Sequence, residues 1–420
     1  MLDIKAIREN PDAFKKDLAR KGVPASAIEK LLDTDKKRRE KIQKIESIAA
    51  QQNEVSKKIP QLKGDEKQKI LSEMKSLSAE KKKLEGELEV LEMNYEQIFC
   101  STPNPPHPSA PDGKDEEDNV VIRTEGTKPE FDFKTLEHWE IGEKLGILDT
   151  ERSAKVSGSR FYYLREELAT LQRALIFWAF REITKRGYSP TIPPFLTREK
   201  AIFGTGYLAK DENYIVNPGE DDLYLIGTSE VPMVSYYADE ILEEDHMPAR
   251  FVSYSPCFRR EAGSYGKDTK GIFRVHQFEK VEMVVFCLPE DSEALHEEIR
   301  EIEEDLLRQL EIPYQVINVC CGDLGVSAAK KYDLEAWLPG QGKYREMTST
   351  SICTDFQSRR LNIRIRRKNG DIVYAHVLNG TAVSSRPLIG ILENFQQKDG
   401  SVKIPKALQP FCGFEKIEAQ

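Results

Sequence analysis

Two long stretches near the start of the chain carry apolar residues at spacings of three and four. The first runs from about Ser26 to Lys63 and the second from Asp65 to Phe99. This spacing is typical of amphipathic helices, whose apolar residues share one face. Because the break around Gly64 is so short, the two predicted helices must return on each other as an antiparallel coiled coil. At about 1.5 Å per residue, such an arm would extend by roughly 50 Å.

The apolar seam of the predicted arm uses residues of both helices, and Lys81 interrupts it at one position. The seam residues are Ile28, Leu31, Ile42, Ile45, Ala49, Val55, Ile59 and Leu62 in the first helix and Ile70, Met74, Leu77, Leu84, Leu88, Leu91, Tyr95 and Ile98 in the second. Before the arm, Asn10 and Pro11 interrupt a helical stretch. Asparagine caps helices well and proline suits a first helical position, so we expect a new helix to begin there.

Basic residues gather on the predicted arm, with glutamates among them. They include Lys36, Lys37, Arg38, Arg39, Lys41, Lys44, Lys57, Lys58, Lys63, Lys67, Lys69, Lys81, Lys82 and Lys83. A solvated face of mixed charge and a surface that contacts an RNA backbone are both compatible with this pattern. The net charge of -9 excludes a general attraction to nucleic acid, so any RNA contact must be local.

The stretch from Ser101 to Asn119 contains five prolines and an acidic run, which exclude a regular helix or a central strand. We interpret it as a linker. The predicted domains are therefore a helical arm at residues 1–100, a linker at 101–119 and a larger domain at 120–420.

The cysteine pattern and the apolar runs indicate where the protein acts. The seven cysteines are scattered without CxxC pairs, which favours buried reduced thiols. The chain begins without a basic and apolar leader, and no run approaches the roughly 18 apolar residues that span a bilayer. We expect a cytoplasmic protein with no membrane contact.

The stretch from Phe258 to Glu282 is predicted to form a hairpin with a long loop at Gly263, Ser264, Gly266, Lys267, Asp268 and Gly271. Its arginines are suited to phosphate oxygens, its aromatic rings to a base, and its glutamates to amino groups. These residues are Arg259, Arg260, Arg274, His276, Phe278, Glu261, Glu279 and Glu282. The alternative is a surface hairpin with a solvated charge run.

Three further stretches carry polar groups at element boundaries. Thr228, Ser229 and Glu230 lie between a predicted strand and helix, where helix capping is the simpler interpretation. Glu346 and Ser349 combine a carboxylate with a hydroxyl, which suits Mg²⁺ held against ATP phosphates, although an exposed loop explains them equally well.

The third stretch begins with a predicted hairpin around Asn369 and Gly370, whose return strand leads to Thr381. A helix with Pro387 in its first turn follows. Arg386 at its start opposes the helix dipole, a placement that makes sense if this residue meets an anion.

These motifs together resemble the seryl-tRNA synthetases of the bacterial type, a family of class II aminoacyl-tRNA synthetases. The pattern Phe-Arg-x-Glu, a variable loop and Arg-x-His-Gln-Phe-x-Lys-x-Glu resembles motif 2 of that class. The proline-rich segment ending at Pro194 resembles motif 1, and the segment around Arg386 resembles motif 3. The sequence TDFQxRR at 354–360 is similar to the seryl enzymes, whereas Ile352 stands where asparagine is expected.

The resemblance implies an α+β fold, in which an antiparallel sheet of six or seven strands follows the coiled-coil arm. It implies ATP-dependent activation of L-serine to seryl-adenylate, transfer of serine to the 3′ end of tRNA-Ser, a homodimer, and tRNA contact through the arm. Arg259 and Arg386 would be the catalytic residues.

The resemblance also implies the residues that contact each substrate. Serine would be bound by Thr228, Ser229, Glu230, Glu282 and Thr381, with Glu282 at the ammonium group and the others around the side chain. ATP would be bound by Arg259, Arg260, Glu261, Arg274, Val275, His276, Gln277, Phe278, Glu346, Met347, Thr348, Ser349 and Arg386, and Mg²⁺ would be held at Glu346 and Ser349.

Three other classes of protein remain as alternatives. A synthetase-like binding protein without activity would be expected to lack Arg259, Glu282 or Arg386, and all three are present. A ligase that aminoacylates carrier proteins would be expected to lack the arm. A simple coiled-coil protein leaves the C-terminal motifs unexplained.

Overall fold

The computed structural model describes residues 2–61, 63–207, 213–216, 223–261, 266 and 268–419, with the exception of the Gln61 side chain. The predicted seam residue Leu62 and the predicted loop residues Gly263, Ser264 and Lys267 therefore lie outside the described residues. The chain forms two compact units, one ending at Pro105 and the other beginning at Pro106. Each is described by itself.

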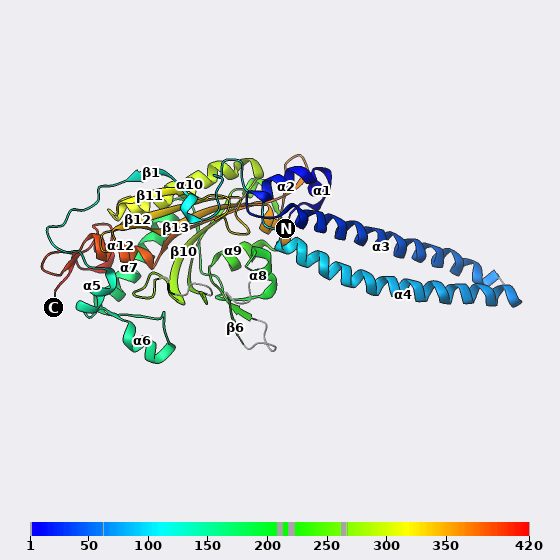
Figure 1. Ribbon diagram of the computed structural model, residues 1–420, viewed down its shortest axis with the longest axis horizontal. Helices are drawn as coiled ribbons and strands as arrows, with labels where there is room; N and C mark the ends of the chain where they lie inside the picture. The colour runs from blue at the N-terminus through cyan, green and yellow to red at the C-terminus, as the bar shows by residue number, and fades with distance from the viewer. Residues whose placement is uncertain are drawn as a thin grey trace. The chain divides into compact units, whose positions relative to one another are not determined.

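The first unit begins with two short helices and continues into the arm (Figure 1). Helix α1 (Ile4–Glu9) ends where α2 (Pro11–Ala19) begins, and the Asn10 side chain accepts a hydrogen bond from the backbone N–H of Ala13 at 3.3 Å. The predicted cap and helix start are therefore confirmed. The arm consists of α3 (Ala25–Lys58), a 3₁₀ turn (Ile59–Gln61) and α4 (Gly64–Ser101).

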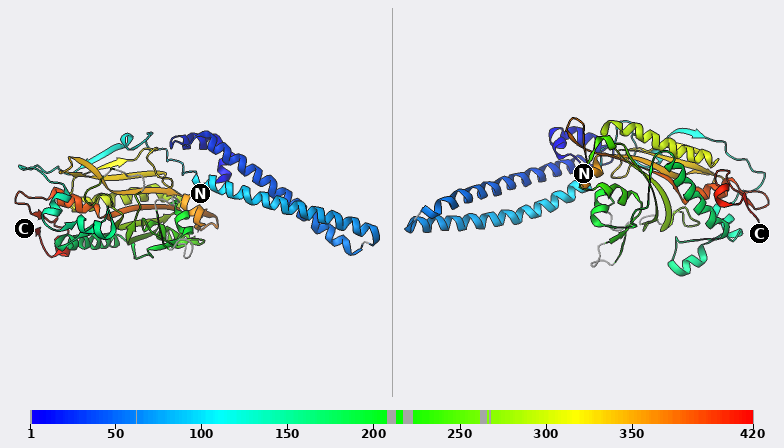
Figure 2. Two further views of the ribbon diagram at one scale, coloured as in Figure 1. Left: turned by 60° about the horizontal axis from the view of Figure 1, so that its bottom comes forward. Right: turned by 180° about the vertical axis from the view of Figure 1, so that it is seen from behind.

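The two arm helices are antiparallel, as predicted, and lie side by side in both views of Figure 2. Arg38 pairs with Glu92 at 3.3 Å, Lys41 pairs with Glu87, and the Gln52 amide donates to Ser78 at 2.9 Å. Residue numbers in α3 rise from pair to pair while those of their partners in α4 fall, and these pairs define the antiparallel register. The seam also contains Ile48, which the sequence analysis missed and which is 7% exposed.

The predicted linker is divided between the two units. Helix α4 continues to Ser101, and the residues after Pro105 pack on the second unit. The backbone N–H of His107 donates to Ala329 at 2.8 Å, that of Cys321 donates to Pro111 at 2.8 Å, and Ala110 is buried. The prolines thus give this segment an extended path across a folded surface.

The second unit contains an eight-stranded sheet in the order β1-β11-β12-β13-β16-β10-β9-β4. Neighbouring strands are antiparallel except for the edge pair β4 and β9, which is parallel. The strands are β1 (Val120–Glu125), β4 (Ser189–Thr191), β9 (Ala249–Phe258), β10 (Gln277–Cys287), β11 (Tyr314–Asn318), β12 (Lys330–Leu338), β13 (Lys343–Thr354) and β16 (His376–Ser384). The expected antiparallel α+β fold is confirmed, but the expected six or seven strands fall short of the eight observed.

Helices α7 (Glu166–Thr184) and α10 (Ser292–Gln309) pack on the sheet, and the core forms between them and the strands. In β10 the side chains alternate between this core and the opposite face, as the pleat of a strand requires. Val281 and Met283 join the core, whereas Lys280 and Glu282 line a cavity. Ile352 also faces the core, and its carbonyl accepts from the N–H of Ala329 at 2.7 Å.

Smaller elements surround the main sheet. The predicted hairpin is present, with β14 (Arg364–Arg366) and β15 (Ile372–Tyr374) joined by a turn in which Gly370 has φ +91°. The other strands are β2 (Leu148–Asp149), β3 (Tyr163–Leu164), β5 (Leu196–Arg198), β6 (Tyr214–Val216), β7 (Leu223–Leu225), β8 (Ile241–Glu243), β17 (Val402–Lys403) and β18 (Lys416–Ile417). The other helices are α5 (His138–Lys144), α6 (Thr150–Ser157), α8 (Glu199–Thr205), α9 (Glu230–Val234), α11 (Phe356–Leu361), α12 (Arg386–Asn394) and α13 (Gln409–Cys412).

Two predictions about the whole chain can be compared with this fold. All seven cysteines are free thiols, and six of them are buried, as expected. Within the described residues, we find no helix with the length and apolar character needed to cross a membrane.

Candidate active site

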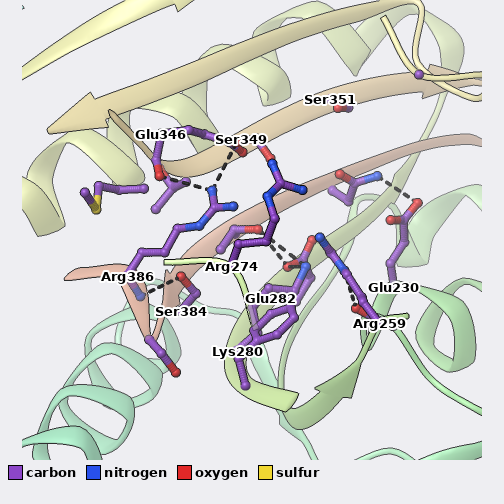
Figure 3. Close-up of a pocket in the computed structure, with 18 of the residues that line it drawn as sticks. Glu230, Arg259, Arg274, Lys280, Glu282, Glu346, Ser349, Ser351, Ser384 and Arg386 are labelled. Carbon is purple, nitrogen blue, oxygen red and sulfur yellow. Dashed lines mark hydrogen bonds and ion pairs between the residues drawn. The ribbon is translucent and has the colours of Figure 1, made fainter. Parts of the chain in front are cut away.

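A cavity of about 560 Å³ opens on the face of the sheet opposite the core. Strands β10, β13 and β16 form its floor, and the ends of the β9 to β10 hairpin and the start of α12 form its walls (Figure 3). The predicted site residues that line it are Arg259, Glu261, Arg274, Val275, Phe278, Glu230, Glu282, Glu346, Met347, Thr348, Ser349, Thr381 and Arg386. Segments far apart in the sequence therefore meet in one place.

Arg259 lies at the end of β9, directly opposite the start of β10. Its backbone N–H donates to His276 at 2.9 Å, and its Nε donates to the carbonyl of Gly227 at 3.2 Å. The guanidinium carbon lies 5.1 Å from the centre of the Phe278 ring. This cation–π contact and the hydrogen bond orient the guanidinium, while the half-buried ring of Phe278 provides an apolar platform beside it.

Arg274 approaches the cavity from the return segment of the hairpin, which becomes a regular strand only at Gln277. Its Nη1 donates to Glu261 at 2.7 Å, and its Nε lies 3.9 Å from Asp268. Glu261 has φ +51°, a backbone conformation that only a few per cent of residues other than glycine adopt. Arg274 and Glu261 thus form an ion pair between the two sides of the hairpin.

Arg386 and Glu346 form an ion pair at the other end of the cavity (Figure 3). Nη1 of Arg386 lies 3.0 Å from Oε2 of Glu346 and donates to its backbone carbonyl at 3.1 Å. Burial by itself raises the pKa of Glu346, but the charges of Arg386 and Lys331 outweigh it and lower the pKa to about 2. Glu346 is therefore ionised at neutral pH.

Glu282 and Thr381 lie on adjacent strands in the centre of the cavity. Glu282 is 2% exposed, forms an ion pair with Lys280 and accepts a hydrogen bond from the Thr381 hydroxyl at 3.1 Å. The Lys280 ammonium also lies 3.4 Å from that hydroxyl. A buried carboxylate with a cationic partner in contact has its charge balanced within the protein.

Glu230, at the start of α9, has hydrogen-bond partners of a different kind. Its Oε2 accepts from the Tyr207 hydroxyl at 2.7 Å, and its Oε1 accepts from the amides of Gln357 at 2.7 Å and Asn379 at 3.0 Å. Burial raises the pKa of Glu230 and the nearby Glu282 raises it further, while the hydrogen bonds from Gln357 and Tyr207 lower it. All three of these hydrogen-bond donors are neutral.

Five predicted site residues lie outside the cavity lining. The Thr228 hydroxyl accepts from the backbone N–H of Glu230 at 3.2 Å, which is a capping contact, and the Ser229 hydroxyl accepts from Ser253 at 2.9 Å. Nδ1 of His276 contacts the carbonyl of Arg259 at 2.9 Å. Arg260 and Gln277 are also absent from the lining. These residues border the site without facing it.

The polar residues of the site that had not been predicted include Lys280, Tyr207, Gln357 and Asn379. A signal existed for Lys280, because its spacing of two residues from Phe278 and Glu282 on one strand places all three side chains on the same face. The sequence gives no such signal for Tyr207 or Gln357, whose distance from Glu230 along the chain hides their contact.

The fit of Mg²⁺ to Glu346 and Ser349 can be judged from the donor atoms. Both residues line the cavity on β13, and they offer an ionised carboxylate and a hydroxyl, the oxygen ligands that Mg²⁺ prefers. In the part of the chain that the structure describes, no cluster of three or more His, Cys, Asp or Glu side chains could hold a metal ion. The donor set therefore fits an ion that takes its remaining ligands from substrate phosphates and water.

Comparison with known proteins extends these observations to the whole chain. A family described as "tRNA synthetase class II core domain (G, H, P, S and T)" matches residues 210–395, and one described as "Seryl-tRNA synthetase N-terminal domain" matches residues 1–106. The serine–tRNA ligase of the bacterium Thermobifida fusca is 46% identical over 413 residues, which cover 98% of each chain.

Solved structures are also similar over the full length of the chain. The seryl-tRNA synthetase of Pyrococcus horikoshii, complexed with ATP, has a TM-score of 0.92 and 42% identity and covers 100% of both chains. The cytoplasmic serine–tRNA ligase of Naegleria fowleri, in complex with AMP, has a TM-score of 0.87 and 33% identity and covers 100% of this chain and 99% of that one. On the strength of both matched domains and this full-length identity, the chain belongs to the seryl-tRNA synthetase family.

Proposed function

We infer that this protein activates L-serine with ATP to give seryl-adenylate and diphosphate, and then transfers serine to the 3′ end of tRNA-Ser. The observation that carries this inference is the distribution of charge along one cavity. Three arginines from separate segments, Arg259, Arg274 and Arg386, line this cavity together with the buried carboxylates of Glu230 and Glu282 (Figure 3). The phosphates of ATP require positive charge and the ammonium group of an amino acid requires a carboxylate, and one cavity offers both.

The first step requires little acid or base chemistry. The carboxylate of serine is already ionised at neutral pH. Its oxygen attacks the α-phosphorus of ATP, and the bond from that phosphorus to the oxygen bridging to the β-phosphate breaks, so that diphosphate leaves with the electron pair. The protein must align the two substrates and stabilise charge as the bond breaks.

We propose that Arg259 holds the α-phosphate, because its guanidinium is oriented by Gly227 and Phe278 next to Glu230. Arg274 and Arg386 hold the rest of the triphosphate, Phe278 covers the adenine and Glu261 accepts from its amino group. Val275, Met347, Thr348 and Ser349 complete the ATP pocket. The hydroxyl of Thr348 donates to Glu303 at 3.1 Å beneath the sheet, so the contact of this residue with ATP comes from its backbone.

For serine, the charge balance favours roles opposite to those first expected for the two carboxylates. Glu282 already has the cationic partner Lys280, whereas the partners of Glu230 are neutral. A buried carboxylate without a counter-charge is costly unless a cation joins it. We therefore assign the serine ammonium group to Glu230 and the serine hydroxyl to Glu282 and Thr381.

Glu346 and Ser349 would hold Mg²⁺ against the phosphates of ATP. The ion, when bound, neutralises phosphate charge and draws electrons from the leaving diphosphate. Before ATP binds, the ion pair with Arg386 keeps the Glu346 carboxylate ionised and directed toward the cavity.

Three further proposals concern the assembly and its setting. Phe177 on α7 and Ile192 beside β4 are 61% and 71% exposed, and Ile192 belongs to the segment that resembles motif 1, which favours a homodimer formed there. The basic arm is suited to the RNA backbone of tRNA-Ser. Free thiols and a role in translation favour the cytoplasm.

Charging of unfractionated tRNA tests this function. Purified protein, ATP, Mg²⁺ and one labelled amino acid at a time should give acid-precipitable label with serine alone. The label should appear on tRNA that carries serine anticodons. Equal labelling by several amino acids, or labelling of a carrier protein in place of tRNA, would overturn the proposal.

A further inference from the structure

His138 is the first residue of α5, is 1% exposed and does not line the cavity. Its Nε2 lies 3.1 Å from the backbone nitrogen of Ile272. A backbone N–H can only donate, so this Nε2 accepts and carries no proton. The proton of the neutral ring is therefore on Nδ1, which donates to Oε1 of Glu393 at 3.2 Å. The surroundings thus fix a single tautomer.

Glu393 occupies an unusual place for an acid, one residue before the end of α12, where the helix dipole disfavours negative charge. It is fully buried. Besides the His138 ring, the backbone N–H groups of His138 and Gly340 donate to it at 3.1 Å and 2.9 Å. A buried carboxylate must be satisfied by donors, and here the donors come from separate segments. Glu393 therefore joins these segments to α12.

The start of α5 is fastened to the end of α12 a second time. The Gln396 side chain accepts from the backbone N–H of Leu136 at 2.9 Å and donates to the Leu136 carbonyl at 3.1 Å. With both backbone groups of Leu136 and the ring of His138 engaged, residues 136–138 cannot shift without breaking several hydrogen bonds. His138 is consequently a rigid attachment point.

The return segment of the β9 to β10 hairpin is held closely against this point. Gly271 has φ +71°, and a Cβ there would lie 2.0 Å from Nε2 of His138, so only glycine allows the approach. On the other side of Gly271, the Lys270 ammonium lies 4.1 Å from the centre of the Trp139 ring. The side chains of the first residues of α5 therefore contact residues 270–272 on both sides of Gly271.

The end of this contact segment and the residues that follow it line the part of the cavity assigned to ATP. Ile272, Phe273 and Arg274 all line it. The Phe273 ring lies 4.6 Å from the guanidinium carbon of Arg386, the residue that begins α12. One path from His138 therefore leads to Arg274 through two residues of backbone, and another leads through Glu393 to the helix that carries Arg386.

We propose that His138 is a positioning residue for ATP. By joining the backbone of Ile272 to α12 through Glu393, it fixes the spacing between Arg274 and Arg386, the two arginines assigned to the triphosphate. This inference rests on the proposed binding of ATP in the cavity. It does not depend on which amino acid is activated.

Two substitutions separate the two hydrogen bonds of the ring. In His138→Asn the amide lies near the position of Nδ1, so it can still donate to Glu393 but cannot reach Ile272. In His138→Gln the amide lies near the position of Nε2, so its oxygen can accept from Ile272. The Gln variant should therefore preserve the contact with the hairpin, and the Asn variant should lose it.

The test measures the KM for ATP and the KM for serine in diphosphate exchange, with ATP binding by calorimetry as a second readout. We expect His138→Asn to raise the KM for ATP about tenfold, with less than a twofold change for serine, because one oriented hydrogen bond is lost far from Glu230. His138→Gln should recover most of this loss. Equal rises for ATP and serine, or equal behaviour of the two variants, would overturn the proposal.

The outcome is distinguishable from a failure of the proposed function. If the wild-type protein binds ATP but exchanges diphosphate with an amino acid other than serine, the assigned substrate is wrong, and the comparison of the two His138 variants by calorimetry still decides the role of His138. Thermal unfolding of both variants shows whether each is folded at the assay temperature. A folded His138→Asn variant with wild-type ATP affinity would contradict the proposal by itself.

Discussion

The ammonium group of Lys280 forms an ion pair with the carboxylate of Glu282, two residues further along β10. Glu230, in the same cavity, accepts three hydrogen bonds from neutral donors. This contrast is the basis of the roles proposed for the two carboxylates, because a substrate ammonium group gains more from the acid that has no cation beside it.

Substitution of the two carboxylates should therefore have different consequences. Glu230→Gln removes the counter-charge of the ammonium group, which all amino acids share, so kcat/KM should fall by about a hundredfold or more for serine and alanine alike. Glu282→Gln removes an acceptor of the serine hydroxyl, so preference for serine over alanine should fall. Diphosphate exchange with both amino acids checks this. Loss of selectivity in Glu230→Gln, with selectivity retained in Glu282→Gln, would show that the roles are reversed.

Arg259→Lys keeps a positive charge but loses the planar fork that donates to Gly227 and lies near Phe278. The contact with the α-phosphate should strengthen as the bond to diphosphate breaks, so the variant should lose mainly turnover. We expect kcat for adenylation to fall by about a hundredfold or more, with serine affinity changed little. Single-turnover measurements of adenylate formation give both quantities. Near-normal turnover would exclude this role for Arg259.

His296 gives the catalytic unit a stability that depends on pH. It is fully buried on α10, its Nε2 donates to the carbonyl of Thr350 at 3.1 Å, and burial lowers its pKa to about 4. The unfolded chain binds a proton near pH 6.5 and the folded chain only near pH 4, so stability falls as the pH is lowered through this window. The loss should be on the order of 3 kcal/mol at pH 4.

Thermal unfolding from pH 7 to pH 4, compared with His296→Gln, measures this contribution. The glutamine amide can still donate to Thr350 but does not titrate. The difference in Tm between the two proteins should shrink or change sign as the pH falls. A constant difference across the range would mean that His296 binds its proton equally well in both states.

The arm can be removed without touching the cavity. Deleting residues from Asp33 to Glu92 removes the cross-helix pairs and most of the basic surface. If the arm binds tRNA-Ser, serine-dependent diphosphate exchange should persist, while charging of tRNA falls by at least about a hundredfold, because the phosphate contacts of the arm are lost. Exchange and charging are measured on the same preparation. Unchanged charging would contradict a role of the arm in tRNA binding.

Much of this architecture follows from local sequence patterns. The cap at Asn10, the turn at Gly370 and the antiparallel return around Gly64 each depend on residues a few positions apart, and each was predicted. Thirteen of the residues that line the cavity belong to short motifs, so they could be named in advance.

The contacts that could not be predicted join residues far apart in the chain. Tyr207 and Gln357 meet at Glu230, and His138 joins Ile272 to Glu393. The spacing of apolar residues along the sequence does not predict such contacts, because they depend on how whole helices and strands pack against each other. The roles proposed for Glu230 and Glu282 depend in part on such contacts, because the neutral partners of Glu230 come from distant segments.

We propose that this cavity activates serine and rejects alanine and threonine. Serine-dependent exchange of labelled diphosphate into ATP by the wild-type protein, measured side by side with alanine and threonine, tests it most directly. We predict that kcat/KM for serine exceeds that for alanine by about 10⁴ or more, since alanine leaves Glu282 and Thr381 without the hydroxyl. Exchange with alanine or threonine at a rate comparable to serine, or no exchange with serine, would contradict the account.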